Sequence, residues 1–159
     1  MAAGAVAWLT AVSGALGYGT PSQTRAASPV AEEVPGYAVE DFNYPGADRI
    51  LAEQNILLKR GDGHITLVDC SSGTGFIEVL ARRQSSKVCF KVVGNSGWLT
   101  MEIPAVYSMK GNDYTTQVDM TVGAEEQSYE LDKNTWTAVG ESADEQGREH
   151  VLVEIRSTK

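Results

Sequence analysis

From about Asp41 onward, short runs of alternating apolar and polar residues are separated by turn residues. In the run DYTTQVDMTVG, for example, Val118 and Met120 alternate with Gln117 and Asp119. Such alternation places the apolar side chains on one face of a strand. The runs that predict strands are NILLKR, HITLVDC, FIEVLARR, VCFKVVG, WLTMEI, DYTTQVDMTVG, QSYEL, TWTAVG and HVLVEIRST. About eight or nine short strands at this spacing predict an all-β fold, an antiparallel β-sandwich of jelly-roll or immunoglobulin-like type.

A different period precedes the strands. In NYPGADRILAEQN, Pro45 comes early and Asp48 falls in the first turn. The apolar Ile50 and Leu51 lie three and four residues after Ala47, which is the spacing of one helix face. This segment therefore predicts one short helix before the sheets.

Glycine-containing segments between the strands predict tight turns. The segment GDG, at residues 61–63, predicts a hairpin-type turn, because glycine tolerates a positive φ. Gly94-Asn95-Ser96-Gly97, between VCFKVV and WLTMEI, predicts a second hairpin for the same reason. Pro104 marks a strand end or an edge, because proline cannot donate to a sheet ladder.

The N-terminal region differs from the rest of the chain. Residues 1–27 are apolar and rich in small residues, and they predict a signal peptide, although no basic residue precedes Arg25. Several glycine and hydroxyl residues interrupt the run, so we expect no stable membrane insertion after cleavage. Residues 28–40 are rich in Pro, Ala and Glu and predict a flexible linker. Residues 41–159 have the length of a single domain.

Charge narrows the range of partners. Only one of the 13 basic residues, Arg25, precedes Glu32, so the remainder of the chain has 12 basic and 21 acidic residues and a net charge near −9. Nucleic acids and anionic lipids are themselves negative and are repelled by such a surface. The sequence therefore predicts a secreted, acidic domain that does not bind nucleic acid.

Cys70 and Cys89 are the two cysteines of the chain. An even number of cysteines in an exported protein favours a disulfide, whereas two buried thiols are expected in a reducing compartment. Cys70 ends one predicted strand and Cys89 lies in the strand after next, so either a strand pair or two facing sheets can bring them together. We expect the bridge to form.

A hydrolase is one alternative. His64, Asp69 and Ser96 occur in the chain order of the trypsin-like proteases, and Gly94-Asn95-Ser96-Gly97 resembles part of their nucleophile loop. That family places these residues on two β-barrels, whereas here they fall in one small domain. On a single strand, His64 and Asp69 are separated by about 16 Å at roughly 3.3 Å per residue. We therefore expect Ser96 to lie in a turn, and we predict no catalytic residues.

A carbohydrate-binding module is the second alternative. Aromatic rings exposed on a β-sandwich can stack on sugar rings. Trp136 is the better candidate because its neighbours are polar, with Tyr129 and Tyr114 as further candidates, whereas Trp98 follows an apolar strand and is expected in the core.

Other motifs give weak signals. His150 and His64 lie 86 positions apart and are expected at strand ends or on the surface. The acidic segments GNDYTTQVD and DEQG lack the spacing of a calcium-binding loop, so we predict no metal site and no cofactor. Arg60-Gly61-Asp62 matches the tripeptide that integrins bind, and we interpret it as a coincidence at a tight turn.

The segments LLKRGDGHI and VCFKVVGNSGWLTMEI and the acidic last third resemble small secreted proteins of Streptomyces and related actinomycetes. This resemblance extends over most of the chain from Tyr44 and implies no residue roles. Subtilisin-inhibitor-type proteins and enediyne-binding apoproteins are similarly small, acidic and β-rich, but they typically have two disulfides and this chain can form only one. We expect a secreted, non-enzymatic domain that binds an extracellular protein or glycan.

Overall fold

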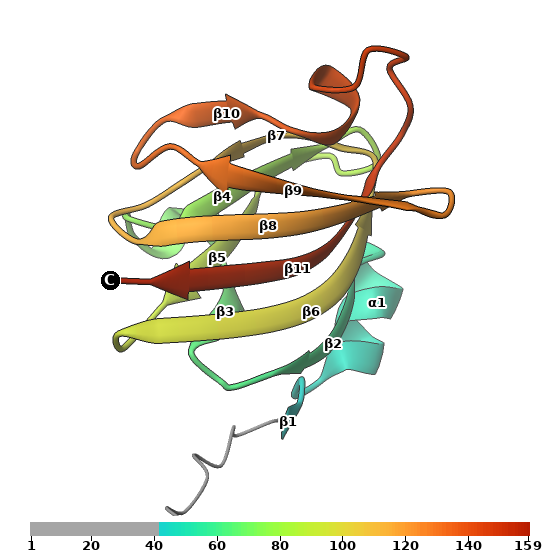
Figure 1. The fold of residues 1–159 in the computed structure, drawn as a ribbon. Coiled ribbons are helices and arrows are strands. Elements are labelled where there is room, and N and C mark those ends of the chain that lie inside the picture. The colour runs from blue at the N-terminus through green and yellow to red at the C-terminus, as the bar shows by residue number, and fades with distance from the viewer. Residues whose placement is uncertain (1–41) are drawn as a thin grey trace, which may run out of the picture. The chain divides into compact units, whose positions relative to one another are not determined.

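A computed structural model describes residues 42–159, and these form two antiparallel sheets packed as a sandwich with one short helix (Figure 1). The predicted β-sandwich is confirmed. The strands of the six-stranded sheet are, in spatial order, β1 (Phe42–Asn43), β2 (Leu57–Gly61), β6 (Ser96–Pro104), β11 (Val151–Thr158), β8 (Thr115–Val122) and β9 (Glu125–Leu131). Those of the five-stranded sheet are β10 (Trp136–Ala138), β7 (Val106–Lys110), β4 (Ile77–Ala81), β5 (Val88–Val92) and β3 (Ile65–Val68).

The inward faces of the two sheets form one apolar core. Phe90 and Met109 contribute to it from the five-stranded sheet, and Met101, Met120 and Ile155 from the six-stranded sheet. Each of these side chains is fully buried, and the residues on either side of Met101, Met109 and Ile155 are more exposed. The period-two pattern of the sequence thus corresponds to the two faces of each sheet.

Both hairpins that the sequence predicts are wrong. Residues 62–64 join β2 to β3 and residues 93–95 join β5 to β6, so each connection carries the chain from one sheet to the other, and Ser96, expected in a turn, is the first residue of β6. The two crossings lie against each other, since Val93 N–H donates to the His64 carbonyl at 2.9 Å. Turn residues such as Asn and Gly permit a sharp change of direction, but they do not specify which sheet receives the next strand.

The strand β7 was not predicted from the sequence. It follows β6 after a single residue, Ala105, which has a φ of +57°. A non-glycine residue rarely adopts this left-handed conformation, so no glycine marks the turn. Together with the two-residue β1, β7 raises the number of strands to eleven within residues 42–159.

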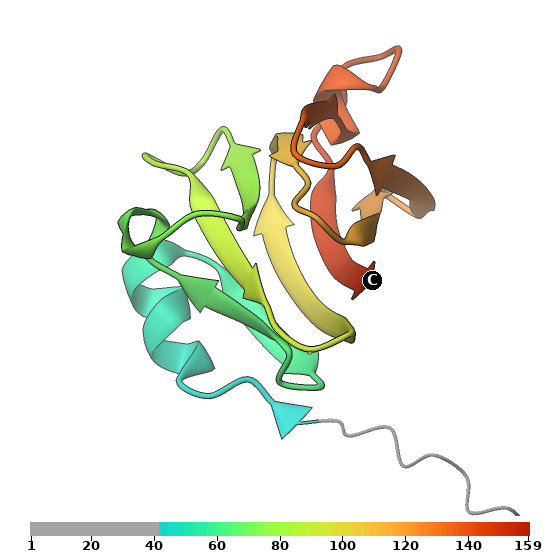
Figure 2. The ribbon, with the colours of Figure 1, turned by 90° about the vertical axis from the view of Figure 1, so that its left-hand side faces the viewer.

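The predicted helix is confirmed as α1 (Ala47–Gln54). It begins after Gly46, whose φ is +68°, and ends at Asn55, whose φ of +54° is the left-handed conformation common at helix C-termini. Figures 1 and 2 show α1 at one side of the sandwich, next to β2 and β3. At the other side, beyond β9 and β10, the chain forms the short turn η2 (Gly140–Ser142) and a loop that returns to β11.

The predicted signal peptide and linker lie outside the described residues. Among the helices formed by residues 42–159, none has both the length and the apolar character needed to cross a membrane.

Candidate functional site

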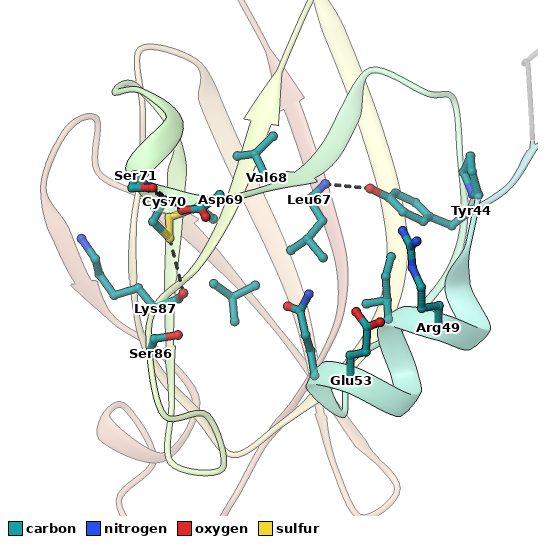
Figure 3. A pocket seen from close by; sticks show the side chains of 15 residues that line it. Tyr44, Arg49, Glu53, Leu67, Val68, Asp69, Cys70, Ser71, Ser86 and Lys87 are labelled. Atoms are coloured by element: carbon teal, nitrogen blue, oxygen red, sulfur yellow. Dashed lines mark hydrogen bonds between the residues drawn. A yellow bond between two sulfur atoms is a disulfide. The ribbon is translucent and has the colours of Figure 1, made fainter.

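A cleft of about 690 Å³ lies between α1, β3 and residues 86–89 at the start of β5, and we call it the α1–β3 cleft (Figure 3). Its volume falls in the range of pockets that bind small ligands or short segments of chain. Apolar groups of Ile50, Leu67 and Val68 line it, and the polar residues Arg49, Glu53, Asp69, Ser71, Ser86 and Lys87 surround them. The cleft therefore offers both apolar contact and polar partners.

The helix is anchored near both of its ends, and the cleft lies between the anchors. Before the helix, Tyr44 Oη accepts a hydrogen bond of 2.7 Å from the Leu67 N–H of β3, and Tyr44 N–H donates to the Lys59 carbonyl of β2. At its C-terminal end, the carbonyl of Gln54 accepts from Gln84 Nε2 at 2.9 Å. These bonds fix the helix at two points.

The Tyr44 hydroxyl is neutral at ordinary pH. Burial raises the pKa of Tyr44 above its usual value, and the hydrogen bond from the Leu67 N–H offsets part of that rise. A neutral hydroxyl that accepts one hydrogen bond still has its own hydrogen to donate. Within residues 42–159 no acceptor is bonded to that hydrogen, so it is free for a ligand.

The main chain of β3 faces the cleft at Leu67. β3 is an edge strand, paired only with β5, and Leu67 donates its N–H to Tyr44 instead of to β5. In an antiparallel strand the N–H and C=O of one residue point to the same side. The Leu67 carbonyl therefore also faces away from β5, toward the open edge.

The predicted disulfide is confirmed and forms part of the cleft wall. Cys70 and Cys89 are bonded, with their Cα atoms 5.3 Å apart. Of the two arrangements that the sequence allowed, the structure has the strand pair, because Val68, two residues before Cys70, is the register partner of Cys89. The Cys70 sulfur also lies 3.3 Å from the Lys87 carbonyl, a contact without a hydrogen bond because a disulfide sulfur carries no hydrogen.

Two charged residues of the rim are already engaged. Asp69 accepts from the N–H and the hydroxyl of Ser71, and these bonds hold the pKa of Asp69 below its usual value. Lys87 is paired with Glu78, whose pKa is lowered first by the hydrogen bond from Lys87 and further by Lys110.

Arg49 and Glu53, one turn apart on α1, differ from these residues. Within the described part of the chain neither side chain forms an ion pair or hydrogen bond, although both line the cleft. A free guanidinium and a free carboxylate are thus available next to the free hydroxyl hydrogen of Tyr44. Figure 3 shows these side chains projecting from the helix side of the cleft.

The three residues of the hydrolase hypothesis have separate partners. His64 Nδ1 lies 3.3 Å from a carboxylate oxygen of Asp62, Asp69 is bonded to Ser71 at the start of η1 (Cys70–Ser72), and Ser96 pairs with Thr158 in the six-stranded sheet. Asp62, the acid of the Arg-Gly-Asp tripeptide, also accepts from the N–H groups of His64 and Trp98. Its carboxylate is only 13% exposed, and through these bonds it connects the segment between β2 and β3 to the start of β6.

The three predicted ligand-binding aromatics differ in exposure. Trp136 is 41% exposed on the edge strand β10. Tyr114 is 8% exposed within the core cluster, with its hydroxyl bonded to the Gly94 carbonyl, and Tyr129 is half-buried against that cluster. Of the three, Trp136 is thus the most exposed.

Two further expectations change. Trp98 is not in the core, because Gly97 and Leu99 on either side of it point inward and Trp98 is partly exposed on the outer face of β6. His150 does precede a strand, but it is fully buried, with Nδ1 2.8 Å from the Arg148 carbonyl and Nε2 without a hydrogen bond partner. Across residues 42–159, no three His, Cys, Asp or Glu side chains are grouped as metal ligands.

Sequence reasoning missed Tyr44, Leu67 and Arg49 as site residues. Their type and spacing give no motif, because the cleft is formed by a helix and a strand brought together in space. The sequence did contain one indirect signal, a tyrosine followed by proline directly before the predicted helix. Neither protein-family models nor curated proteins match this chain.

Proposed function

We propose that this chain is an exported, non-enzymatic binding domain whose α1–β3 cleft holds an extended segment of another extracellular protein as an additional strand beside β3. The observation that carries the proposal is the main chain of Leu67, which faces a cleft of about 690 Å³ from the open edge of an uncharged strand. Strand addition to a sheet edge is a common mode of peptide recognition.

The four sheet edges differ in ways that favour β3. β1 and β10 have two and three residues, and very short edges offer few main-chain groups. β9 has seven residues, but three of them are glutamates, and charged side chains discourage pairing with another strand. The strand β3, with the sequence Ile-Thr-Leu-Val, contains no charge.

The cleft also indicates the chemistry of the segment. A main-chain N–H of the ligand can donate to the Leu67 carbonyl, and a carbonyl of the ligand can accept from Tyr44 Oη. An acidic side chain of the ligand fits next to Arg49 and a basic one next to Glu53. We therefore expect a short extended peptide with charges of both signs and an apolar side chain directed toward Leu67.

The non-enzymatic part of the proposal is supported by the separate partners of His64, Asp69 and Ser96, because nucleophilic catalysis requires the base, its orienting acid and the nucleophile to converge. The proposed export is supported by the apolar N-terminal stretch and by the disulfide. N-terminal sequencing of the chain recovered from culture medium tests it. We expect a start near Ser28, and recovery from the cytosol with Met1 intact would contradict it.

Peptide binding is tested by panning a phage-displayed library of random peptides, about nine residues long, against the full chain. Peptides that are enriched are then synthesised, and their affinity is measured by titration calorimetry. In the double variant Arg49→Glu/Glu53→Arg, which exchanges two exposed charges, we expect the affinity to fall roughly tenfold or more. The matched control Lys133→Glu/Glu130→Arg makes the same kind of exchange on exposed residues outside the cleft and leaves binding unchanged.

Strand addition has a second signature that requires no protein variant. A series of peptides with one methylated backbone nitrogen each loses affinity at every second position, because alternate N–H groups point toward the neighbouring strand. If no peptide is enriched, or if methylation and the Arg49→Glu/Glu53→Arg exchange leave affinity unchanged, the proposal is wrong.

A further inference from the structure

A second pocket lies on the outer face of the six-stranded sheet, away from the residues that form the α1–β3 cleft. Trp98 of β6 and Arg156 of β11 are register partners, and both point away from the core. Next to them is a hollow of about 350 Å³, which Asp62 and Glu154 also line. We call this hollow the Trp98 pocket.

The guanidinium of Arg156 is held in place by two carboxylates. Its Nη1 donates to Asp119 at 2.9 Å, and its Nε donates to Glu154 at 2.5 Å. These two bonds use two of the five N–H groups of the guanidinium, and the remaining three are available to a ligand. Because the group is already oriented, binding costs less conformational entropy than with a free arginine.

Asp119 is the buried carboxylate that holds the guanidinium of Arg156 in place. It is 5% exposed, although it belongs to the outward face of β8, and it also accepts from Ser128 Oγ and Gln117 Nε2. Burial raises the pKa of Asp119, but these hydrogen bonds and the charge of Arg156 outweigh that effect and hold the pKa below its usual value. The carboxylate is therefore ionised at neutral pH, and its charge is satisfied by groups that fix Arg156.

We infer that the Trp98 pocket binds a neutral saccharide. The C–H face of a sugar ring packs on the indole of Trp98, while its hydroxyls accept from Arg156 and donate to Glu154 and Asp62. A hydroxyl both donates and accepts, so a neutral sugar suits a pocket that presents oriented donors and acceptors side by side. An acidic sugar would be repelled, because Asp62, Asp119 and Glu154 outnumber the single guanidinium.

This inference goes beyond the proposed peptide binding, because it concerns other residues and another class of ligand. It also differs from the carbohydrate platform that the sequence predicts on Trp136. That residue is on the edge of the five-stranded sheet, where its register partner Lys110 is paired with Glu78. Trp98, in contrast, has a pocket and a fixed arginine next to it.

The experiment is a pull-down of the full chain on insoluble cellulose, chitin, xylan and peptidoglycan. Affinity is then measured by titration with cellohexaose, xylohexaose or chitohexaose, according to the polymer that retains the protein. We expect retention of the wild type and of Trp136→Ala, which is the matched control for loss of an exposed indole. In Trp98→Ala we expect the affinity to fall roughly tenfold or more.

Because Trp98→Ala can also disturb β6, Arg156→Gln provides a second variant on an exposed side chain. It keeps a polar side chain but loses the fixed guanidinium, and we expect roughly fivefold weaker binding with an unchanged far-UV circular dichroism spectrum. Retention on none of the four polymers overturns the inference, as does retention that Trp136→Ala abolishes and Trp98→Ala does not. Neither result affects peptide binding in the α1–β3 cleft.

Discussion

The two open sides of the sandwich are closed in different ways. Between β2 and β3 the helix α1 is held at its ends and leaves the α1–β3 cleft, and none of its residues is fully buried. Beyond β9 and β10, the two ends of the segment that holds η2, at Gly140 and His150, are buried against the sheets, whereas most of residues 141–149 are exposed. There a Cβ added at Gly140 would lie 2.4 Å from the Val106 carbonyl oxygen, and His150 is fully buried.

This contrast shows where the domain has room for a ligand. A closely packed side has no space for another chain, because interiors are packed as densely as organic crystals. The helix α1, hydrogen-bonded near its two ends and packed on the core through Ile50, still leaves main chain at the edge of β3 facing the cleft. The open cleft that the proposed peptide binding requires therefore lies on the α1 side.

The largest expected effect comes from one substitution made on each side. Gly140→Ala and Gly46→Ala both place a Cβ on a residue with positive φ, +51° and +68°, but only Gly140 has other atoms within 4 Å. The strained φ costs about 1–2 kcal/mol at either site. At Gly140 the clash with Val106 and Met120 adds about 1–3 kcal/mol. Urea unfolding followed by fluorescence measures the loss in the free energy of unfolding for each variant. Equal losses would show that the structure around Gly140 shifts to accommodate the added Cβ without cost.

The disulfide gives the next largest effect. It connects η1, which directly follows β3, to β5 across a sequence separation of 19 residues, so in the chain-entropy model its reduction lowers the free energy of unfolding by about 3 kcal/mol. Urea unfolding with and without a reductant measures this loss. Hydrogen exchange should become faster in β3 while β9 keeps its protection, since β9 is tied to β8 by its own ladder. Uniform acceleration in both strands would contradict the expectation that the bridge protects β3 more than β9.

The sequence was sufficient for the features that depend on local pattern. The alternation in β8, the helical spacing around Ile50 and the two cysteines each predicted the element or bond that the structure has. Such features depend on which face of an element is apolar, and this is a property of neighbouring residues.

Features that depend on how the sheets pack were not predictable in the same way. The turn at Gly94 has the same residues whether it joins two paired strands or crosses between sheets, and Ala105 adopts a positive φ that its sequence does not indicate. Trp98 was expected in the core because its neighbours are apolar, but its position in the alternation of β6 places it outside. The cleft residues Tyr44 and Leu67 are 23 positions apart and meet only in the folded chain.

A third prediction concerns acid stability on the η2 side. Hydrogen bonds from the Arg148 side chain and N–H hold the pKa of Asp144 far below its usual value. A carboxyl whose pKa is lower in the folded state stabilises the fold above its unfolded pKa, near 4, and this contribution is lost as the pH falls toward the folded pKa. Urea midpoints between pH 7 and pH 2 should fall less steeply below about pH 4 in Asp144→Asn than in the wild type.

The control for this prediction is Glu145→Gln in the same loop. It removes an exposed carboxylate that makes no ion pair within the described part of the chain, so the variant should follow the wild-type curve. If Asp144→Asn also follows the wild-type curve, the Asp144–Arg148 pair does not stabilise the η2 side, and that side is held by packing alone.

The smallest expected effect tests the anchor of the α1 side. Tyr44→Phe removes the hydroxyl that accepts from the Leu67 N–H, and the loss of one partly buried hydrogen bond costs about 1 kcal/mol. Tyr107→Phe is the matched control near η2, because within residues 42–159 the Tyr107 hydroxyl makes no hydrogen bond. Urea unfolding should show a loss for Tyr44→Phe alone, together with faster exchange of the Leu67 N–H. Equal stability of the two variants would mean that water replaces the tyrosine hydroxyl at the Leu67 N–H without cost. The edge of β3 would then be open to a ligand strand while the ring of Tyr44 stays in place.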